Sequence, residues 1–80
     1  GVIGLNEAFL SAGAKGVCST LWDIPDKPTS LFMLKLYEKI SKGTDYRIAL
    51  SETKRDFLNG DYGKEYSGPS IWAPFVYYGM

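Results

Sequence analysis

The chain of 80 residues is long enough for one small domain, and its hydrophobic fraction of 45% fits a soluble globular protein. Nine basic and nine acidic residues give a formal net charge of zero, so there is no electrostatic reason to expect nucleic acid or an anionic membrane as a partner. No apolar run approaches the roughly 20 residues of a membrane-spanning helix, and no signal peptide is visible.

The chain has one cysteine, Cys18, and no histidine. A lone thiol cannot form an intrachain disulfide, which favours a reducing, cytoplasmic compartment. Without histidine, this chain cannot by itself supply a histidine metal ligand or a histidine-dependent catalytic dyad, and we expect neither a metal nor a cofactor. Cys18 lies in an apolar run, whereas a reactive thiolate needs access and stabilisation, so we interpret it as a core residue.

The first predicted elements are a helix and a strand. The stretch "GLNEAFLSAG", residues 4–13, is predicted to be a short helix that Gly13 ends. Its apolar residues follow the spacing i, i+3, i+4 and i+7: Leu5, Ala8, Phe9 and Ala12. The next stretch, "KGVCSTLW" at residues 15–22, is apolar on both alternations, as in a strand covered on both faces. A helix followed so closely by such a strand indicates an α/β layer rather than an antiparallel meander.

The stretch "DIPDKPTS", residues 23–30, predicts the start of a longer helix. Pro25 and Pro28 prevent the continuation of a central strand. Asp26 is predicted to be the N-cap, with Pro28 in the first turn. We expect Gly43 to end this helix. Its apolar stripe is wide: Phe32, Met33, Leu36, Tyr37 and Ile40.

A second helix, a loop and a strand complete the chain. Either Thr44 or Asp45 is expected to cap this helix, and Gly60 to end it. Residues 61–70, "DYGKEYSGPS", have no periodic pattern and are predicted to be a polar loop. Residues 75–78, "FVYY", predict a final strand, and the preceding proline favours an edge position or the start of the strand. The expected buried side of the second helix is Tyr46, Ala49, Leu50, Thr53 and Phe57.

The resulting order, α-β-α-α-β, is short of strands. Two strands do not make an independently stable sheet, and three amphipathic helices need an apolar surface to cover. Parallel strands from preceding sequence are the simplest source of that surface. The sequence also begins at Gly1 without an initiator methionine. We therefore expect residues 1–80 to be the C-terminal part of a larger α/β domain.

Two stretches, "AFLSAGAKGVCSTLWDIPD" and the terminal "WAPFVYYG", together with the helix pair between them, resemble the C-terminal portion of CHAT-domain proteins. These are bacterial caspase-like proteins that are often fused to TPR repeats. The resemblance covers residues 4–79, and "LWDIPDK" is also similar to the corresponding stretch of separase, a relative in the same peptidase clan. It implies a caspase-like three-layer sandwich with a mostly parallel sheet and helices on both faces.

The resemblance also implies cysteine-peptidase chemistry by a His-Cys dyad. In the family both dyad residues precede the matched region, with the cysteine at a "SAC"-type strand end. No catalytic residue is therefore assigned within this chain. The implied partners are a peptide or protein substrate, the upstream half of the same domain and TPR repeats in the parent protein.

In the family, the loop that corresponds to "LWDIPD" lies beside the catalytic cysteine and lines the substrate cleft. The resemblance therefore implies that Trp22 forms a wall of the cleft. Asp23 or Asp26 would recognise a basic residue before the scissile bond, since a carboxylate accepts two parallel hydrogen bonds from a guanidinium group. Structural roles remain as alternatives: an N-cap for Asp26, a solvated loop carboxylate for Asp23, and a core or half-buried position for Trp22, as for Trp72.

Two other functions compete with the peptidase. The intact domain could be a non-catalytic scaffold, as pseudo-peptidases of the clan are, and the residues that decide this lie upstream. A stand-alone interaction module is a weaker alternative, because two predicted strands leave too little sheet for three helices.

Overall fold

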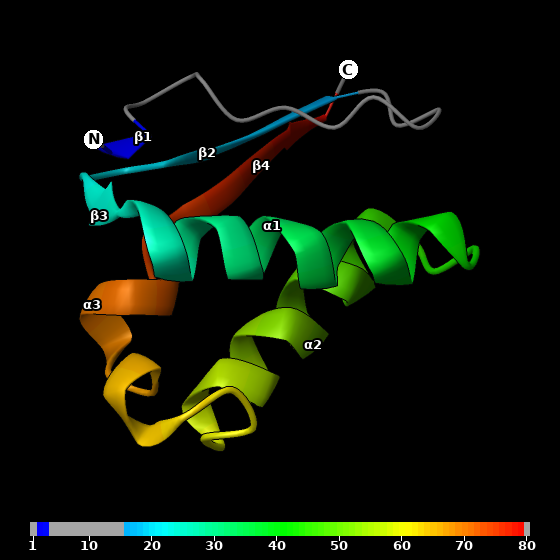
Figure 1. The fold of residues 1–80 in the computed structure, drawn as a ribbon. Helices are drawn as coiled ribbons and strands as arrows, with labels where there is room; N and C mark the ends of the chain where they lie inside the picture. The colour runs from blue at the N-terminus through cyan, green and yellow to red at the C-terminus, as the bar shows by residue number, and fades with distance from the viewer. Residues whose placement is uncertain (1, 4–15, 80) are drawn as a thin grey trace.

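The computed structural model describes residues 2–3 and 16–79. Within them the chain combines helices with short antiparallel strand pairs, which makes it a mixed α/β structure (Figure 1). The helix predicted at residues 4–13 lies outside the described residues. The elements in chain order are β1 (Val2–Ile3), β2 (Gly16–Thr20), β3 (Ile24–Pro25), α1 (Asp26–Ser41), α2 (Tyr46–Leu58), the 3₁₀ helix η1 (Lys64–Tyr66), α3 (Pro69–Trp72) and β4 (Phe75–Gly79).

Both strand pairs in the described residues are antiparallel. Strand β2 pairs with β4, so that Cys18 lies opposite Tyr77 and Thr20 opposite Phe75. The two-residue strand β1 pairs with β3, which the sequence did not predict. The expectation of a mostly parallel sheet is therefore not met by the strands of this part of the chain. The final strand itself, predicted at residues 75–78, is confirmed as β4.

The antiparallel direction of β4 follows from the presence of two long helices between the strands. Helix α1 carries the chain back along the sheet from the end of β2, and α2 then returns it toward the end where α1 began (Figure 1). The amide of Leu21 donates to the carbonyl of Pro74 at 2.9 Å, which holds the end of β2 next to the start of β4. A single crossover helix would instead have delivered a parallel strand.

Helix α1 begins one residue earlier than a capping aspartate would require. Pro25 occupies the N-cap position with φ −55° and ψ 154°, and no side chain caps the helix. The prediction that Asp26 is the N-cap is therefore wrong: the extended backbone of Pro25 ends β3, and the helix starts directly after it with Asp26 as its first residue. A carboxylate in the first turn still interacts favourably with the helix dipole.

The break between α1 and α2 is as the sequence predicted. Gly43 follows α1 with φ +97°, a conformation that side chains with a Cβ rarely adopt. Asp45, and not Thr44, caps α2, because its carboxylate accepts a hydrogen bond from the amide of Arg47 at 3.0 Å. Gly60, with φ +80°, lies just beyond the end of α2.

The core lies between the β2–β4 pair and the helices on one side of it (Figure 1). Its centre is an aromatic cluster in which the ring of Phe32 stacks on Phe75 with centroids 3.7 Å apart and is tilted against Phe57 at 5.2 Å. These rings connect α1, α2 and β4. The buried hydrophobic residues are Cys18, Ile24, Phe32, Leu36, Ala49, Phe57 and Phe75.

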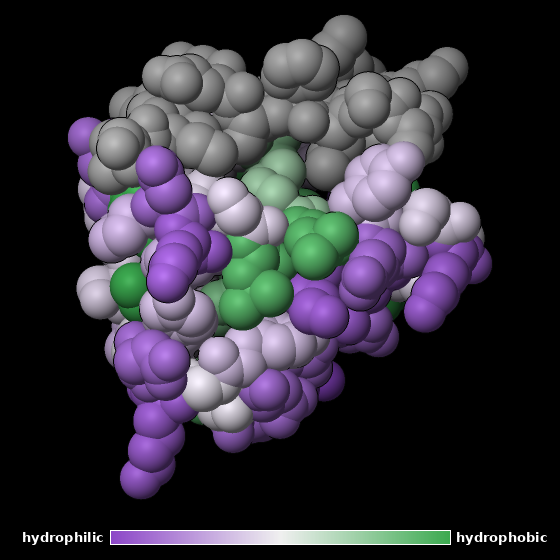
Figure 2. Space-filling view, in the orientation of Figure 1, coloured by the Kyte–Doolittle hydropathy of each residue, from purple (hydrophilic) through white to green (hydrophobic). Residues whose placement is uncertain are grey.

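The apolar stripe of α1 is only partly buried. Tyr37 was expected on the buried side but is 41% exposed, and Leu34 on the same helix is 52% exposed. Figure 2 shows hydrophobic side chains on the face where α1 lies, bordered by hydrophilic ones. The stripe is therefore wider than the surface that the described strands and helices cover.

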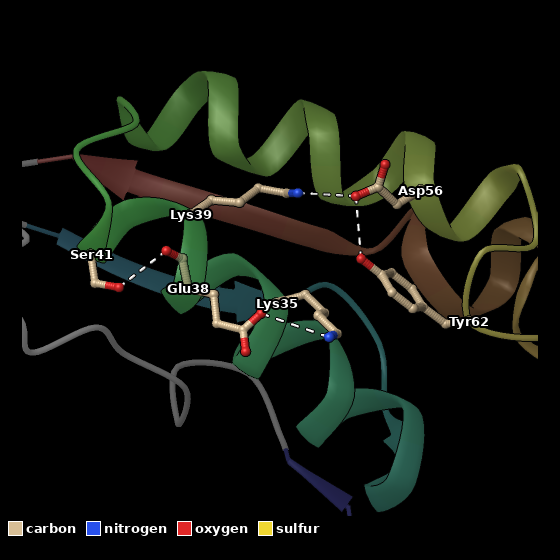
Figure 3. Close-up of polar contacts among 6 residues, drawn as sticks. All are labelled: Lys35, Glu38, Lys39, Ser41, Asp56 and Tyr62. Atoms are coloured by element: carbon tan, nitrogen blue, oxygen red, sulfur yellow. Dashed lines mark hydrogen bonds and ion pairs between the residues drawn. The ribbon is translucent and has the colours of Figure 1, made fainter.

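A polar cluster joins α1 to α2 and to the segment after it (Figure 3). The ammonium group of Lys39 on α1 lies 3.0 Å from a carboxylate oxygen of Asp56 on α2, and the hydroxyl of Tyr62 donates to the same oxygen at 3.3 Å. The Lys35 ammonium lies 5.3 Å from the centre of the Tyr62 ring. Because the ion pair is partly exposed, it contributes about 1 kcal/mol or less to stability.

Replacing Phe32 with alanine is expected to destabilise the intact domain by about 3–5 kcal/mol, because it removes the ring that contacts both Phe57 and Phe75. Thermal or urea unfolding measures this loss. Leu34→Ala is the matched control on the same helix, and we expect it to change stability far less because its side chain is largely exposed. Equal losses in the two variants would contradict the described core.

The phenol of Tyr62 is expected to lose its proton only at unusually high pH. Burial, assisted by the charge of Asp56 and its hydrogen bond, raises the pKa of Tyr62 from 10.0 to about 12. Because this pKa is raised in the folded state, the stability that the neutral phenol contributes is complete below pH 10 and is lost as the pH rises through 12. Asp56→Asn is expected to lower the Tyr62 pKa, as measured by the ultraviolet absorbance of tyrosinate.

Burial also raises the pKa of Tyr77 to about 12, so two tyrosines are expected to titrate in the same pH range. A Tyr62→Phe variant shows which part of the absorbance change belongs to Tyr62. A high-pKa component that is lost in Tyr62→Phe but unchanged in Asp56→Asn would refute the role of the carboxylate.

Candidate functional site

The "LWDIPD" stretch joins β2 to α1 and is mostly exposed. Strand β2 ends at Thr20, two residues short of the prediction, so Trp22 lies in a bend and not in the strand. Asp23 is exposed, whereas Ile24 is buried in the core. The core contact of Ile24 holds the middle of the loop in place and leaves the side chains before it at the surface.

Trp22 connects this loop to a segment far along the chain. Its indole N–H donates a hydrogen bond to the carbonyl of Ser70 on α3 at 3.0 Å. Trp22 is 46% exposed, so it is not a core residue, and about half of its surface is buried. Trp72 is half-buried, as expected, and its indole N–H donates to the carbonyl of Ser67 at 2.9 Å.

An open groove of about 620 Å³ adjoins the end of the loop. One side is the start of α1, and the other is formed by η1 and α3, which lies beneath that first turn in Figure 1. Of the three predicted site residues, Asp26 lines the groove, whereas Trp22 and Asp23 do not. The lining residues are Pro25, Asp26, Lys27, Pro28, Glu65, Tyr66 and Ile71.

The groove combines apolar surface with carboxylates. Two prolines, Ile71 and the ring of Tyr66 supply apolar contact. Asp26 and Glu65 each carry a carboxylate, and Lys27 carries the one ammonium group in the lining, so the formal charge of the groove is −1. Such a lining is suited to a chain that carries both aliphatic surface and a positive charge, such as a lysine or arginine side chain.

Sequence reasoning missed the wall formed by Glu65, Tyr66 and Ile71. Residues 61–70 were predicted to be a loop, but they contain η1 and the start of α3. Both helices are too short to show a hydrophobic period. The one local signal was the Gly-Pro pair at residues 68–69, because proline is favoured at the first position of a helix.

Gly63 allows Glu65 to lie where it does. Gly63 has φ +110°, and a Cβ at this position would lie 2.5 Å from the Glu65 Oε1 atom. The Glu65 carboxylate therefore lies in space that any other residue at position 63 would fill. Gly63 therefore leaves room for one of the two carboxylates of the groove.

Cys18 is a core residue, as predicted. It is buried, and burial raises the pKa of its thiol to about 12, while the charge of Lys54 acts in the opposite direction. The thiol is therefore protonated at neutral pH and has no access to a substrate. The ammonium group of Lys54 donates a hydrogen bond to the carbonyl of Ala73 at 3.4 Å.

Within residues 2–3 and 16–79, no three histidine, cysteine, aspartate or glutamate side chains are grouped so that they could hold a metal ion. None of the helices in this part of the chain has the length and apolar character needed to cross a bilayer.

The sequence model of the CHAT domain matches residues 1–80, and the chain therefore belongs to the CHAT domain family. It is 35% identical over 79 residues to Tetratricopeptide repeat protein 28 of Homo sapiens and 32% identical over 79 residues to that of Mus musculus. Each match covers 99% of this chain but 3% of the relative, so the chain spans a small fraction of these proteins. No solved structure matches it.

The comparisons confirm the resemblance to CHAT domains, and the name of both relatives supports the expected association with TPR repeats. Both relatives are mammalian, so the bacterial origin that the resemblance implied is not confirmed.

Trp22→Phe is expected to loosen α3, since it keeps an aromatic ring but removes the hydrogen bond to Ser70. We expect a loss of about 1 kcal/mol in stability and faster amide exchange at residues 71 and 73, whose amides are bonded within this segment. Hydrogen–deuterium exchange of the intact protein measures this. Tyr37→Phe, at an exposed aromatic residue of α1, is the control. Unchanged exchange in Trp22→Phe would show that the indole does not hold α3.

Proposed function

We propose that residues 1–80 form the C-terminal part of a CHAT-type cysteine endopeptidase domain and supply core elements together with one side of the substrate cleft. Family membership supports the domain assignment. The observation that carries the functional part is the open groove that begins at the end of the "LWDIPD" loop, with the Asp26 carboxylate in its wall.

The remainder of the sheet is expected from the upstream half of the same domain. In the described residues, β2 and β4 form a two-stranded pair beside the layer of helices α1 and α2 (Figure 1), and two strands are rarely stable as an independent sheet. Further strands beside this pair would complete a caspase-like three-layer sandwich with a mostly parallel sheet. The antiparallel β4 would then be an exception to the main strand direction.

The catalytic dyad is also expected upstream. Cys18 is buried and protonated, and the chain has no histidine, so this segment supplies neither nucleophile nor base. In the intact domain, an upstream thiolate would attack the carbonyl carbon of the scissile peptide bond, and the upstream histidine would protonate the leaving amine. Water would then hydrolyse the acyl-enzyme. This chemistry needs no metal or cofactor.

The residues of the loop would act on the substrate side. The exposed Asp23 carboxylate can accept paired hydrogen bonds from a guanidinium group, and Asp26 supplies a second carboxylate at the groove. Trp22 would form a wall of the cleft while its hydrogen bond to Ser70 holds the loop against α3. The partners of the intact protein would be a peptide or protein substrate and TPR repeats of the same chain, in the cytoplasm.

A non-catalytic scaffold is the second candidate. It is favoured by one observation: both curated relatives are named for tetratricopeptide repeats, and such helical repeats build extended surfaces that bind proteins. In this case the groove would bind a protein segment without cleaving it.

Asp23→Ala or Asp26→Ala in the intact CHAT-containing protein is expected to lower kcat/KM for a peptide with arginine before the scissile bond by about tenfold, the effect of losing one charge-assisted interaction. Glu52→Ala, at an exposed carboxylate of α2, is the control and should retain wild-type rates. Cleavage at wild-type rates by both aspartate variants would contradict a role of these carboxylates in recognising a basic residue. Absence of cleavage by the wild-type protein would favour the scaffold.

A further inference from the structure

The groove has two walls that belong to distant parts of the chain. The first turn of α1 provides Asp26 and Pro28, and residues 65–71 provide Glu65, Tyr66 and Ile71. The two walls are tied together beside the groove, because the Trp22 indole donates to Ser70, the residue before Ile71. The width of the groove therefore depends on tertiary contacts between these two segments.

The lining of the groove fits a long cationic side chain. Aliphatic carbons of lysine or arginine can contact Pro28, Ile71 and the Tyr66 ring, and the cationic end can reach a carboxylate. Tyr66 adds an aromatic ring, which attracts a nearby cation. A neutral apolar side chain would make no use of the Glu65 carboxylate, and the formal charge of −1 in the lining disfavours an acidic side chain.

The carboxylates of the loop and of the groove occupy two separate places. Asp23 is exposed on the loop and is not part of the groove, whereas Asp26 and Glu65 line it. Trp22 lies next to Asp23 in the chain and is hydrogen-bonded to α3, on the far side of the groove. An extended peptide that places one basic side chain at Asp23 can therefore place a second one, within a few residues, in the groove.

We propose that the groove between α1 and residues 65–71 binds a second basic side chain of the same peptide, and that Glu65 is a specificity-determining residue for it. This inference rests on the proposed function in one respect, that the occupant is a peptide whose first basic residue is bound by Asp23. The protein then recognises a pair of basic residues in the peptide. Gly63 contributes by leaving the space in which the Glu65 carboxylate lies.

The test measures equilibrium binding to the intact CHAT-containing protein, after alkylation of accessible thiols so that no peptide is cleaved. The probes are fluorescent peptides with a central arginine and a second arginine at each position within three residues of it. In matched peptides one arginine is replaced by citrulline, which has nearly the same shape but no charge. At one flanking position, citrulline is expected to weaken binding to the wild-type protein by about tenfold.

Glu65→Gln removes the charge with little change in shape, and we expect it to reduce this discrimination to twofold or less. Asp61→Asn is the control, since it removes an exposed carboxylate that precedes residues 65–71 and does not line the groove. This variant should retain the full discrimination. In Glu65→Lys, the peptide with citrulline at the flanking position should bind more tightly than the peptide with arginine there.

The outcomes separate the inference from the proposed function. If citrulline weakens binding only at the central position, the groove does not recognise a second basic residue. Recognition of the first basic residue by Asp23 is then still supported. Discrimination that persists in Glu65→Gln would also overturn the inference. If no peptide binds, both proposals fail.

Discussion

The contact between Phe32 and Phe75 is the constraint on which the rest of the structure depends. It stacks a residue from the first half of α1 on the first residue of β4, and Phe57 of α2 packs against the same ring. Burial of aromatic rings is a major source of stability in a small core. Because one ring contacts both a helix and the strand that follows it much later in the chain, this contact determines how the helical layer lies on the sheet.

The position of the groove follows from that arrangement. Phe75 lies opposite Thr20 in the strand pair, so the loop that leaves β2 emerges at the end of the sheet where β4 begins. The segment that leads into β4 contains α3, and the Trp22 indole bonds to it. The "LWDIPD" loop and residues 65–71 are thus brought together by the sheet register, although more than 40 residues separate Trp22 from Ser70 in the sequence.

The chemistry of the segment is consistent with a supporting role in a CHAT domain. Its one thiol is buried beneath the helices, where loss of solvation keeps it protonated. Three of its exposed carboxylates lie at the loop, Asp23, and at the groove, Asp26 and Glu65, where they suit recognition of basic groups and cannot by themselves break a peptide bond. The role proposed for the chain is therefore to supply a binding surface, both in a peptidase and in a scaffold.

The sequence by itself determined the two long helices with their glycine ends, the strands around Cys18 and Phe75, the family and the core position of the thiol, since all of these rest on local period or short motifs. It could not determine that β4 runs antiparallel to β2, because the direction depends on the return path of α2. Nor could it place Asp26 inside the helix instead of at its cap, or reveal η1, whose three residues carry no periodic signal. Only the tertiary structure brought Glu65, Tyr66 and Ile71 opposite Asp26, since that wall is held by packing and by the long-range bond from Trp22.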